Sequence, residues 1–182
     1  MVIDFNKLDK RKSYILLEYG TSLVSKLIDK FTKEYYPCVA HRPSHVLALK
    51  HLGYCWQIFE SHLQPTESLE SGVRTYSQFL FEAEFPKIME STGVVYPFPT
   101  DLRKLKNLLG QPYGVGDILS LGKSYFLHSN GKQKDRTGYI CSEYIASANK
   151  EIQSYFNLPP HCITPAHFLR YLEENNIKPI TF

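Results

Sequence analysis

The first sixty residues combine short apolar runs with one amphipathic segment. Residues 14–19 form an apolar run of the kind that fills a buried strand. Residues 21–33 carry apolar side chains at helical spacing behind a Thr-Ser start, which predicts an amphipathic helix. Two further apolar runs, residues 44–50 and residues 54–61, flank Gly53, and this arrangement predicts a β-hairpin.

Helical patterns dominate the rest of the chain. Residues 64–75 are polar and predict a loop, whereas residues 76–89 fit either a strand or a short helix. The segments with helical patterns or helix-start residues are 102–109, 117–127, 141–155 and 165–173. A charged loop is expected at residues 129–137, and residues 177–182 are compatible with an edge strand because Pro179 lacks a donor N–H. The pattern predicts an α+β fold, an antiparallel sheet packed against helices.

Composition narrows the class of protein. The chain has 182 residues, 43% of them hydrophobic, which predicts a single domain over residues 1–182. Lys and Arg number 21 against 18 Asp and Glu, and no block of like charges occurs, which argues against a nucleic-acid partner. The N-terminus lacks the apolar run of a secretory signal, and no later stretch approaches membrane-spanning length. We therefore expect a cytoplasmic protein without an integral membrane segment.

The predicted hairpin brings a histidine and a carboxylate together. If the turn is centred on residues 52 and 53, His45 lies opposite Glu60 on the same face of the sheet. A slip of one residue would place the two on opposite faces. A carboxylate on one imidazole nitrogen orients the ring and stabilises the imidazolium, which leaves the other nitrogen to act as a base.

Cys141 lies where the charged loop turns into an apolar helix, in the sequence Gly138-Tyr-Ile-Cys-Ser-Glu-Tyr-Ile. Unpaired N–H groups and the positive end of the dipole at a helix start favour the thiolate form of a cysteine. Cys141 is therefore a candidate nucleophile, with His45 as its base. The alternative is a buried, inert thiol, together with a purely structural pair of His45 and Glu60.

Several motifs in this chain follow one another in a characteristic order. They are Leu17-Glu-Tyr-Gly-Thr-Ser, Pro43-Ser-His-Val-Leu-Ala-Leu, Ile58-Phe-Glu-Ser, Gly110-Gln-Pro-Tyr-Gly, Tyr139-Ile-Cys-Ser-Glu-Tyr-Ile and Ile163-Thr-Pro-Ala-His-Phe. Together they resemble the circularly permuted branch of the NlpC-type papain-like cysteine hydrolases, the YiiX-like proteins. The chain order of histidine, glutamate and cysteine inverts the papain order, as a permutation requires.

The resemblance implies a papain-like domain and a catalytic triad. It gives Cys141 the role of nucleophile, His45 that of general base and later acid, and Glu60 that of the residue orienting His45. The implied reaction is hydrolysis of a peptide or peptidoglycan-type amide through an acyl-enzyme, without a cofactor. A lipid acyl bond is the next substrate class, and an acyltransferase or a non-catalytic binding protein with the same fold are the alternatives.

Further residues are candidates for the oxyanion site, the substrate pocket or a metal. A backbone N–H at Cys141 is a natural oxyanion donor, and Tyr113 and Ser44 are candidates for the same region, although Tyr113 could instead pack on the nucleophile helix. Cys38, His41, His45 and Cys55 have spacings that invite a zinc site. Because the second ligand pair typical of structural zinc is missing, we expect no metal.

Overall fold

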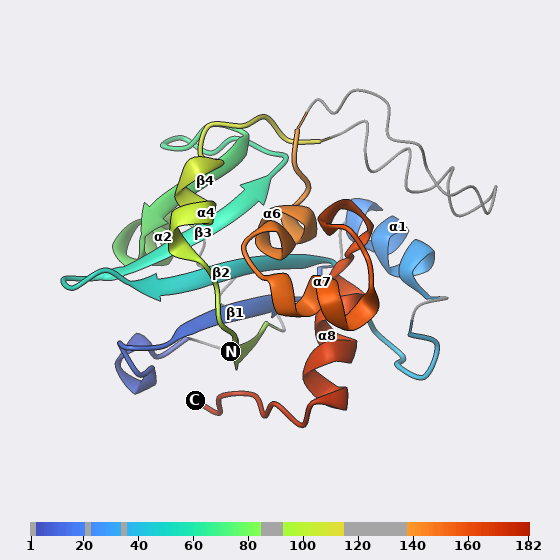
Figure 1. The fold of residues 1–182 in the computed structure, drawn as a ribbon. Coiled ribbons are helices and arrows are strands. Elements are labelled where there is room, and N and C mark those ends of the chain that lie inside the picture. The colour runs from blue at the N-terminus through green and yellow to red at the C-terminus, as the bar shows by residue number, and fades with distance from the viewer. Residues whose placement is uncertain (1–2, 21–22, 34–35, 85–92, 115–137) are drawn as a thin grey trace.

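A five-stranded antiparallel sheet forms the centre of the protein (Figure 1). The computed structural model describes residues 3–20, 23–33, 36–84, 93–114 and 138–182. The strand order across the sheet is β4-β3-β2-β1-β5. The strands are β1 (Ser13–Glu18), β2 (His45–His51), β3 (Trp56–His62), β4 (Gly72–Ser77) and β5 (Val94–Pro97).

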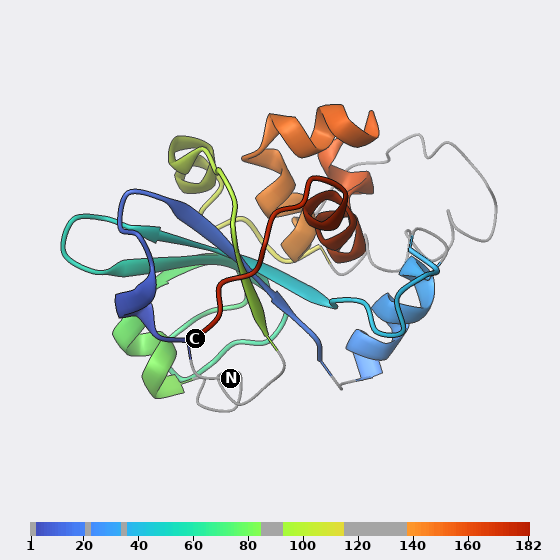
Figure 2. The same cartoon turned by 90° about the horizontal axis from the view of Figure 1, so that it is seen from below.

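Helices cover both faces of the sheet. They are η1 (Phe5–Lys7), α1 (Leu23–Thr32), α2 (Gln78–Glu84), α4 (Leu102–Asn107), α6 (Cys141–Ser147), α7 (Lys150–Phe156), η2 (Pro160–Cys162) and α8 (Pro165–Glu174). In Figure 2 the C-terminal helices α6, α7 and α8 lie on one side of the sheet and α2 lies on the other. The predicted α+β class with an antiparallel sheet is confirmed.

Alternating residues of the strands feed two hydrophobic clusters. On β1, Ile15 and Leu17 join the cluster beneath α6 and α8, whereas Tyr14 and Leu16 join the cluster on the opposite face. Because successive strand residues point to opposite faces, a run that is apolar at every position requires cover on both sides. This explains why residues 14–17 are all buried.

The predicted register of the β2–β3 hairpin is wrong by two residues. The structure pairs His51 with Trp56 and Leu49 with Ile58, so the loop is Leu52–Cys55 rather than a turn centred on residues 52 and 53. Gly53 takes a φ of 90°, and Leu52 N–H donates to the carbonyl of Cys55 across this loop. His45 is therefore not directly opposite Glu60. A shift of two residues preserves the face of every side chain, however, so the two still point to the same side of the sheet.

The single long helix expected from residue 141 to about residue 155 is instead two helices. α6 ends at Ser147 and α7 begins at Lys150, with Asn149 between them. The side chain of Asn149 accepts a hydrogen bond from Ile152 N–H and donates one to the carbonyl of Pro99. Asparagine is a strong helix N-cap, and this contact to another segment stabilises the break. The expected last helix agrees closely with α8, whose capping box is made by Thr164 and His167.

Strands β4 and β5 are absent from the sequence prediction. The expected loop over residues 64–75 overlaps β4, and the ambiguous residues 76–89 contain the end of β4 followed by α2. Residues 177–182 do not form the edge strand considered above, although Ile180 N–H donates to Val95 on β5. The helix expected at 117–127 and the loop at 129–137 lie outside the described residues. No helix in the described ranges combines the length and the apolarity needed to cross a membrane.

Candidate active site

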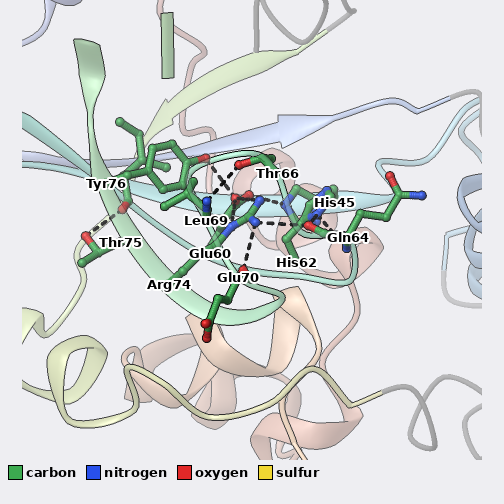
Figure 3. A network of polar contacts seen from close by, with 11 residues as sticks. His45, Glu60, His62, Gln64, Thr66, Leu69, Glu70, Arg74, Thr75 and Tyr76 are labelled. Atoms are coloured by element: carbon green, nitrogen blue, oxygen red, sulfur yellow. Dashed lines mark hydrogen bonds and ion pairs between the residues drawn. The ribbon is translucent and has the colours of Figure 1, made fainter. Parts of the chain in front are cut away.

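Glu60 is held on β3 by donors from the neighbouring strand β4. It lies opposite Arg74 in the sheet, and only 2% of its surface is exposed. Arg74 contributes Nε at 2.8 Å and Nη2 at 2.7 Å to Oε1 of Glu60, and the Tyr76 hydroxyl donates to the same oxygen at 3.0 Å (Figure 3). One carboxylate oxygen is thus fully engaged, which fixes the carboxylate and leaves Oε2 for another partner.

That other partner is His45 at the start of β2. Its Nε2 lies 3.2 Å from Oε2 of Glu60 (Figure 3). Cys141 is the second group that acts on this ring, since its charge and hydrogen bonding raise the pKa of His45. Because Nε2 is engaged by Glu60, Nδ1 is the ring nitrogen left for the sulfur. The structure therefore places the imidazole between the sulfur and the carboxylate.

Cys141 is the first residue of α6, which packs on β2 and β3. The N-cap residue Ile140 provides no side-chain acceptor for the first turn of this helix. Just before the helix, the carbonyl of Tyr139 accepts a hydrogen bond of 2.5 Å from the Ser61 hydroxyl on β3. This contact anchors the approach to Cys141 beside the strand that carries Glu60.

Exposure differs within the three-residue cluster of Cys141, His45 and Glu60. Cys141 is 3% exposed, whereas 15% of the His45 side chain is exposed. The imidazole is therefore more accessible than the thiol.

The charges of the cluster support one another. Burial acts to raise the pKa of Glu60, but the hydrogen bond and charge of His45 and the charge of Arg74 lower it to about 2. Burial acts to lower the pKa of His45, but the charge and hydrogen bond of Cys141, the hydrogen bond of Glu60 and the charge of Glu18 raise it well above its usual 6.5. The environment thus favours the imidazolium form of His45, held beside the Glu60 carboxylate and the Cys141 sulfur.

His62 contacts the same imidazole. The rings of His45 and His62 meet edge to face, with centroids 5.5 Å apart and an interplanar angle of 84°. Burial and the positive charge of His45 lower the pKa of His62. His62 therefore favours its neutral form. It packs against the His45 ring without placing a second positive charge beside it.

Tyr113, a candidate for the oxyanion site, interacts electrostatically with the cluster. It forms an isolated parallel bridge with Tyr139, two residues before Cys141. Burial, the charge of Cys141 and the charge of Glu60 raise the pKa of Tyr113. Its phenol consequently keeps its proton and remains a hydrogen-bond donor at neutral pH.

Ser44 has a different place from the one suggested for it. Its hydroxyl accepts a hydrogen bond from Gly20 N–H at 3.0 Å and donates to the carbonyl of Glu18 at 3.4 Å. The side chain is buried and joins the end of β1 to the start of β2. We therefore assign Ser44 to the support of His45 rather than to the substrate pocket.

Sequence reasoning missed four residues around the cluster, namely Glu18, His62, Arg74 and Tyr76. Arg74 and Tyr76 belong to β4, which was not predicted because the polar residues before it indicated a loop. An arginine and a tyrosine at alternate positions, Arg74-Thr-Tyr76, were the only available sign that one polar face of a strand was present. His62 and Glu18 end strands that were recognised, but their contacts depend on the register and the strand order.

The four residues weighed as zinc ligands do not come together. Within the described ranges, no three His, Cys, Asp or Glu side chains form a group that could hold a metal ion. Cys38 is exposed, whereas Cys55 is buried in the β2–β3 loop and its sulfur accepts a hydrogen bond from Gln57.

No protein-family model matches the chain, and no curated protein matches it. A sulfur, an imidazole and a carboxylate in sequence can generate a nucleophile and return a proton to a leaving group.

Proposed function

We propose that this protein is a papain-like thiol hydrolase in which Cys141, His45 and Glu60 form the catalytic triad. The observation that carries the proposal is the position of His45, whose ring lies 3.2 Å from Glu60 and whose pKa is raised by the charge and hydrogen bonding of Cys141 at the start of α6. A histidine that is merely structural needs partners for its nitrogens, but it does not need one of them to be a thiol at a helix start. The chain order of the triad and the motifs around it support the permuted papain-like assignment.

The first half of the reaction forms an acyl-enzyme. The Cys141 thiolate attacks the carbonyl carbon of the substrate amide, and a C–S bond forms. When the tetrahedral intermediate collapses, the C–N bond breaks and the leaving nitrogen takes the proton from the His45 imidazolium. Glu60 keeps the ring oriented, and its charge stabilises the imidazolium before this transfer.

The second half releases the acid. Neutral His45 removes a proton from a water molecule while the water oxygen attacks the thioester carbon. The C–S bond then breaks, a carboxylic acid leaves, and the thiolate–imidazolium pair is restored. No redox step or cofactor is required, since every proton that His45 gives in the first half is recovered in the second.

Two groups are suited to stabilise the oxyanion of the tetrahedral intermediates. Backbone N–H groups at the start of α6 point along the positive end of the helix, where negative charge is favoured. The Tyr113 phenol keeps its proton and lies within the electrostatic reach of Cys141. We propose Tyr113 as a second donor to the oxyanion.

The proposed substrate is a peptide or peptidoglycan-type amide. This class is suggested by the motif resemblance, and it fits a site in which a protonated imidazole can donate to an amine leaving group. A lipid acyl substrate would use the same nucleophile, so the two classes differ only in the acyl group and in the acceptor.

An acylating probe tests the proposal directly. The native protein and Cys141→Ala are treated with p-nitrophenyl acetate, and peptide mapping by mass spectrometry locates the acetyl group. We expect a burst of nitrophenolate and one acetyl group on Cys141 in the native protein, and neither in Cys141→Ala. Equal labelling of both proteins would rule out the nucleophile. Digestion of peptide and muropeptide mixtures then separates the substrate classes.

A further inference from the structure

Glu18, at the end of β1, is a second carboxylate beside the candidate catalytic histidine. It pairs directly with His45 in the antiparallel ladder of β1 and β2. Directly opposed residues have Cβ atoms about 4.5–5.5 Å apart and share a face of the sheet. Glu60, on the strand at the other side of β2, lies on that same face. His45 is therefore flanked by a carboxylate from each neighbouring strand.

The Glu18 carboxylate is held differently from that of Glu60. Within the described part of the chain, its Oε1 is buried and accepts no hydrogen bond. A buried carboxylate oxygen without a donor is costly, so its retention calls for an explanation. Packing alone does not supply one, because a glutamine or an apolar residue would fill the same space at lower cost.

We propose that Glu18 is a positioning residue of the catalytic site, whose carboxylate stabilises the imidazolium of His45 from the side opposite Glu60. This inference rests on the proposed function of His45. A charge on this side requires no hydrogen bond to act, because the two residues are cross-strand neighbours and the Glu18 Oε1 atom is buried. In this role Glu18 acts through His45.

The charged and titratable groups around the pair agree with this role. The charges of His45 from β2 and Glu60 from β3 shift the pKa of Glu18. The charge of Glu18 in turn raises the pKa of Tyr76 from β4. His45 additionally meets Cys141 from α6 and His62 from β3. Burial and the charge of Glu60 raise the pKa of Glu18 to about 7, against the opposing charge of His45. The charge of Glu18 therefore develops near neutral pH, and once present it helps to raise the pKa of His45.

The test follows His45 itself. The imidazole titration is recorded by NMR on protein carrying isotope-labelled histidine, and His45→Ala identifies its signal among the seven histidines. The variants are Glu18→Gln, which removes the charge at almost constant shape, and Glu18→Asp, which keeps it. Glu82→Gln, an exposed residue on α2, is the matched control.

We expect the midpoint of the His45 titration to fall by about one pH unit in Glu18→Gln. We expect it to remain within about a third of that shift in Glu18→Asp and to be unchanged in Glu82→Gln. Acetylation of Cys141 by the probe should slow in Glu18→Gln above about pH 7 and match the native rate below about pH 6, where Glu18 is protonated in any case. A purely structural role would instead lower the rate at every pH.

The result that would overturn the inference is an unchanged His45 midpoint in Glu18→Gln while the native protein still acetylates on Cys141. The proposed function fails separately, if the native protein does not acetylate at all. A shift of the His45 midpoint in Glu18→Gln would then still support the electrostatic link between the two residues. Should Glu18→Gln not fold, the uncharged Glu18→Met takes its place: a His45 midpoint lower by about one pH unit supports the role of the charge, and an unchanged midpoint contradicts it.

Discussion

His45 has a carboxylate on each side, and the two flanks of the ring differ in how that carboxylate is held. On the β3 side, Glu60 receives an arginine and a tyrosine at one oxygen and the imidazole at the other. On the β1 side, Glu18 has a buried oxygen that accepts nothing from the described residues. The pKa of Glu60 is lowered to about 2, whereas that of Glu18 is raised to about 7.

The difference shows that hydrogen-bond donors, rather than burial, decide whether a carboxylate in this site is charged. Burial favours the protonated form of both residues. Only Glu60 has enough donors to reverse this effect. We infer that Glu60 provides a permanent charge and a fixed geometry, whereas Glu18 provides a charge that varies with pH.

Removing Arg74 should disrupt the β3 flank most strongly. Arg74→Met leaves Glu60 buried beside His45 without the guanidinium group. The carbonyls of Gln64 and Glu70 also lose the hydrogen bonds that Arg74 donates to them. We expect a loss of about 3–5 kcal/mol in the free energy of unfolding. Urea titration followed by the fluorescence of Trp56, the single tryptophan, measures this loss.

Arg170→Met is the matched control for that experiment. Arg170 also pairs with a glutamate, Glu174, at 2.9 Å, but these side chains are 41% and 37% exposed, against 7% and 2% for Arg74 and Glu60. Its removal should change the free energy of unfolding by less than about 0.5 kcal/mol. Equal losses in the two variants would contradict the importance of the buried network.

Glu60→Gln should affect the chemistry more than the fold. The amide cannot stabilise the imidazolium by charge, and the orientation of the ring is weakened. We expect acetylation of Cys141 by p-nitrophenyl acetate to slow by about 100-fold. Glu82→Gln serves as control, and a rate for Glu60→Gln within about twofold of the native rate would remove Glu60 from the triad.

The two carboxylates should give stability opposite dependences on pH. Glu60 has a folded-state pKa of about 2, below its usual 4.5, so its contribution is present above about pH 4.5 and is lost as the pH falls toward 2. Glu18 has a folded-state pKa of about 7, above 4.5, so its contribution is present below about pH 4.5 and is lost as the pH rises through 7.

Glu18→Gln isolates the second effect. Between about pH 4.5 and 7, the native protein should lose about 2 kcal/mol relative to this variant. Urea unfolding at a series of pH values gives the difference. Parallel curves for the two proteins would show that Glu18 does not titrate between these limits.

Tyr76→Phe should have the smallest effect. The change removes one of the donors to Glu60 and leaves the arginine in place, so we expect a loss of about 1.5 kcal/mol in the free energy of unfolding. Tyr54→Phe is the matched control, because Tyr54 is 79% exposed on the β2–β3 loop. A loss as large in Tyr54→Phe as in Tyr76→Phe would mean that the hydroxyl bond to Glu60 contributes nothing of its own.

The proximity of His45 and Glu60 could be predicted from the sequence. The face of the sheet to which a strand side chain points depends only on whether its position along the strand is odd or even. The register error of two residues left that parity unchanged, so His45 and Glu60 were correctly placed on one face. The position of Cys141 as the first residue of α6 was likewise readable, since a loop rich in charge gives way there to an apolar helix.

The supporting residues could not be predicted in the same way. Arg74 and Tyr76 reach Glu60 only because β4 pairs with β3, and β4 is a short edge strand that follows a polar loop. Glu18 reaches His45 only through the order of the strands, which local patterns do not encode. The contact between α6 and the start of β2 is tertiary, and no spacing in the chain predicts it.

The central claim, that Cys141 and His45 act as one chemical unit, is tested most directly by alkylation of the thiol. The native protein and His45→Ala are treated with iodoacetamide at about pH 6, where an ordinary thiol reacts slowly, and peptide mapping follows each cysteine. The exposed Cys38 provides an internal reference in the same sample. We predict that His45→Ala slows alkylation of Cys141 by about tenfold or more and leaves that of Cys38 unchanged. An equal rate at Cys141 in the two proteins would contradict the account.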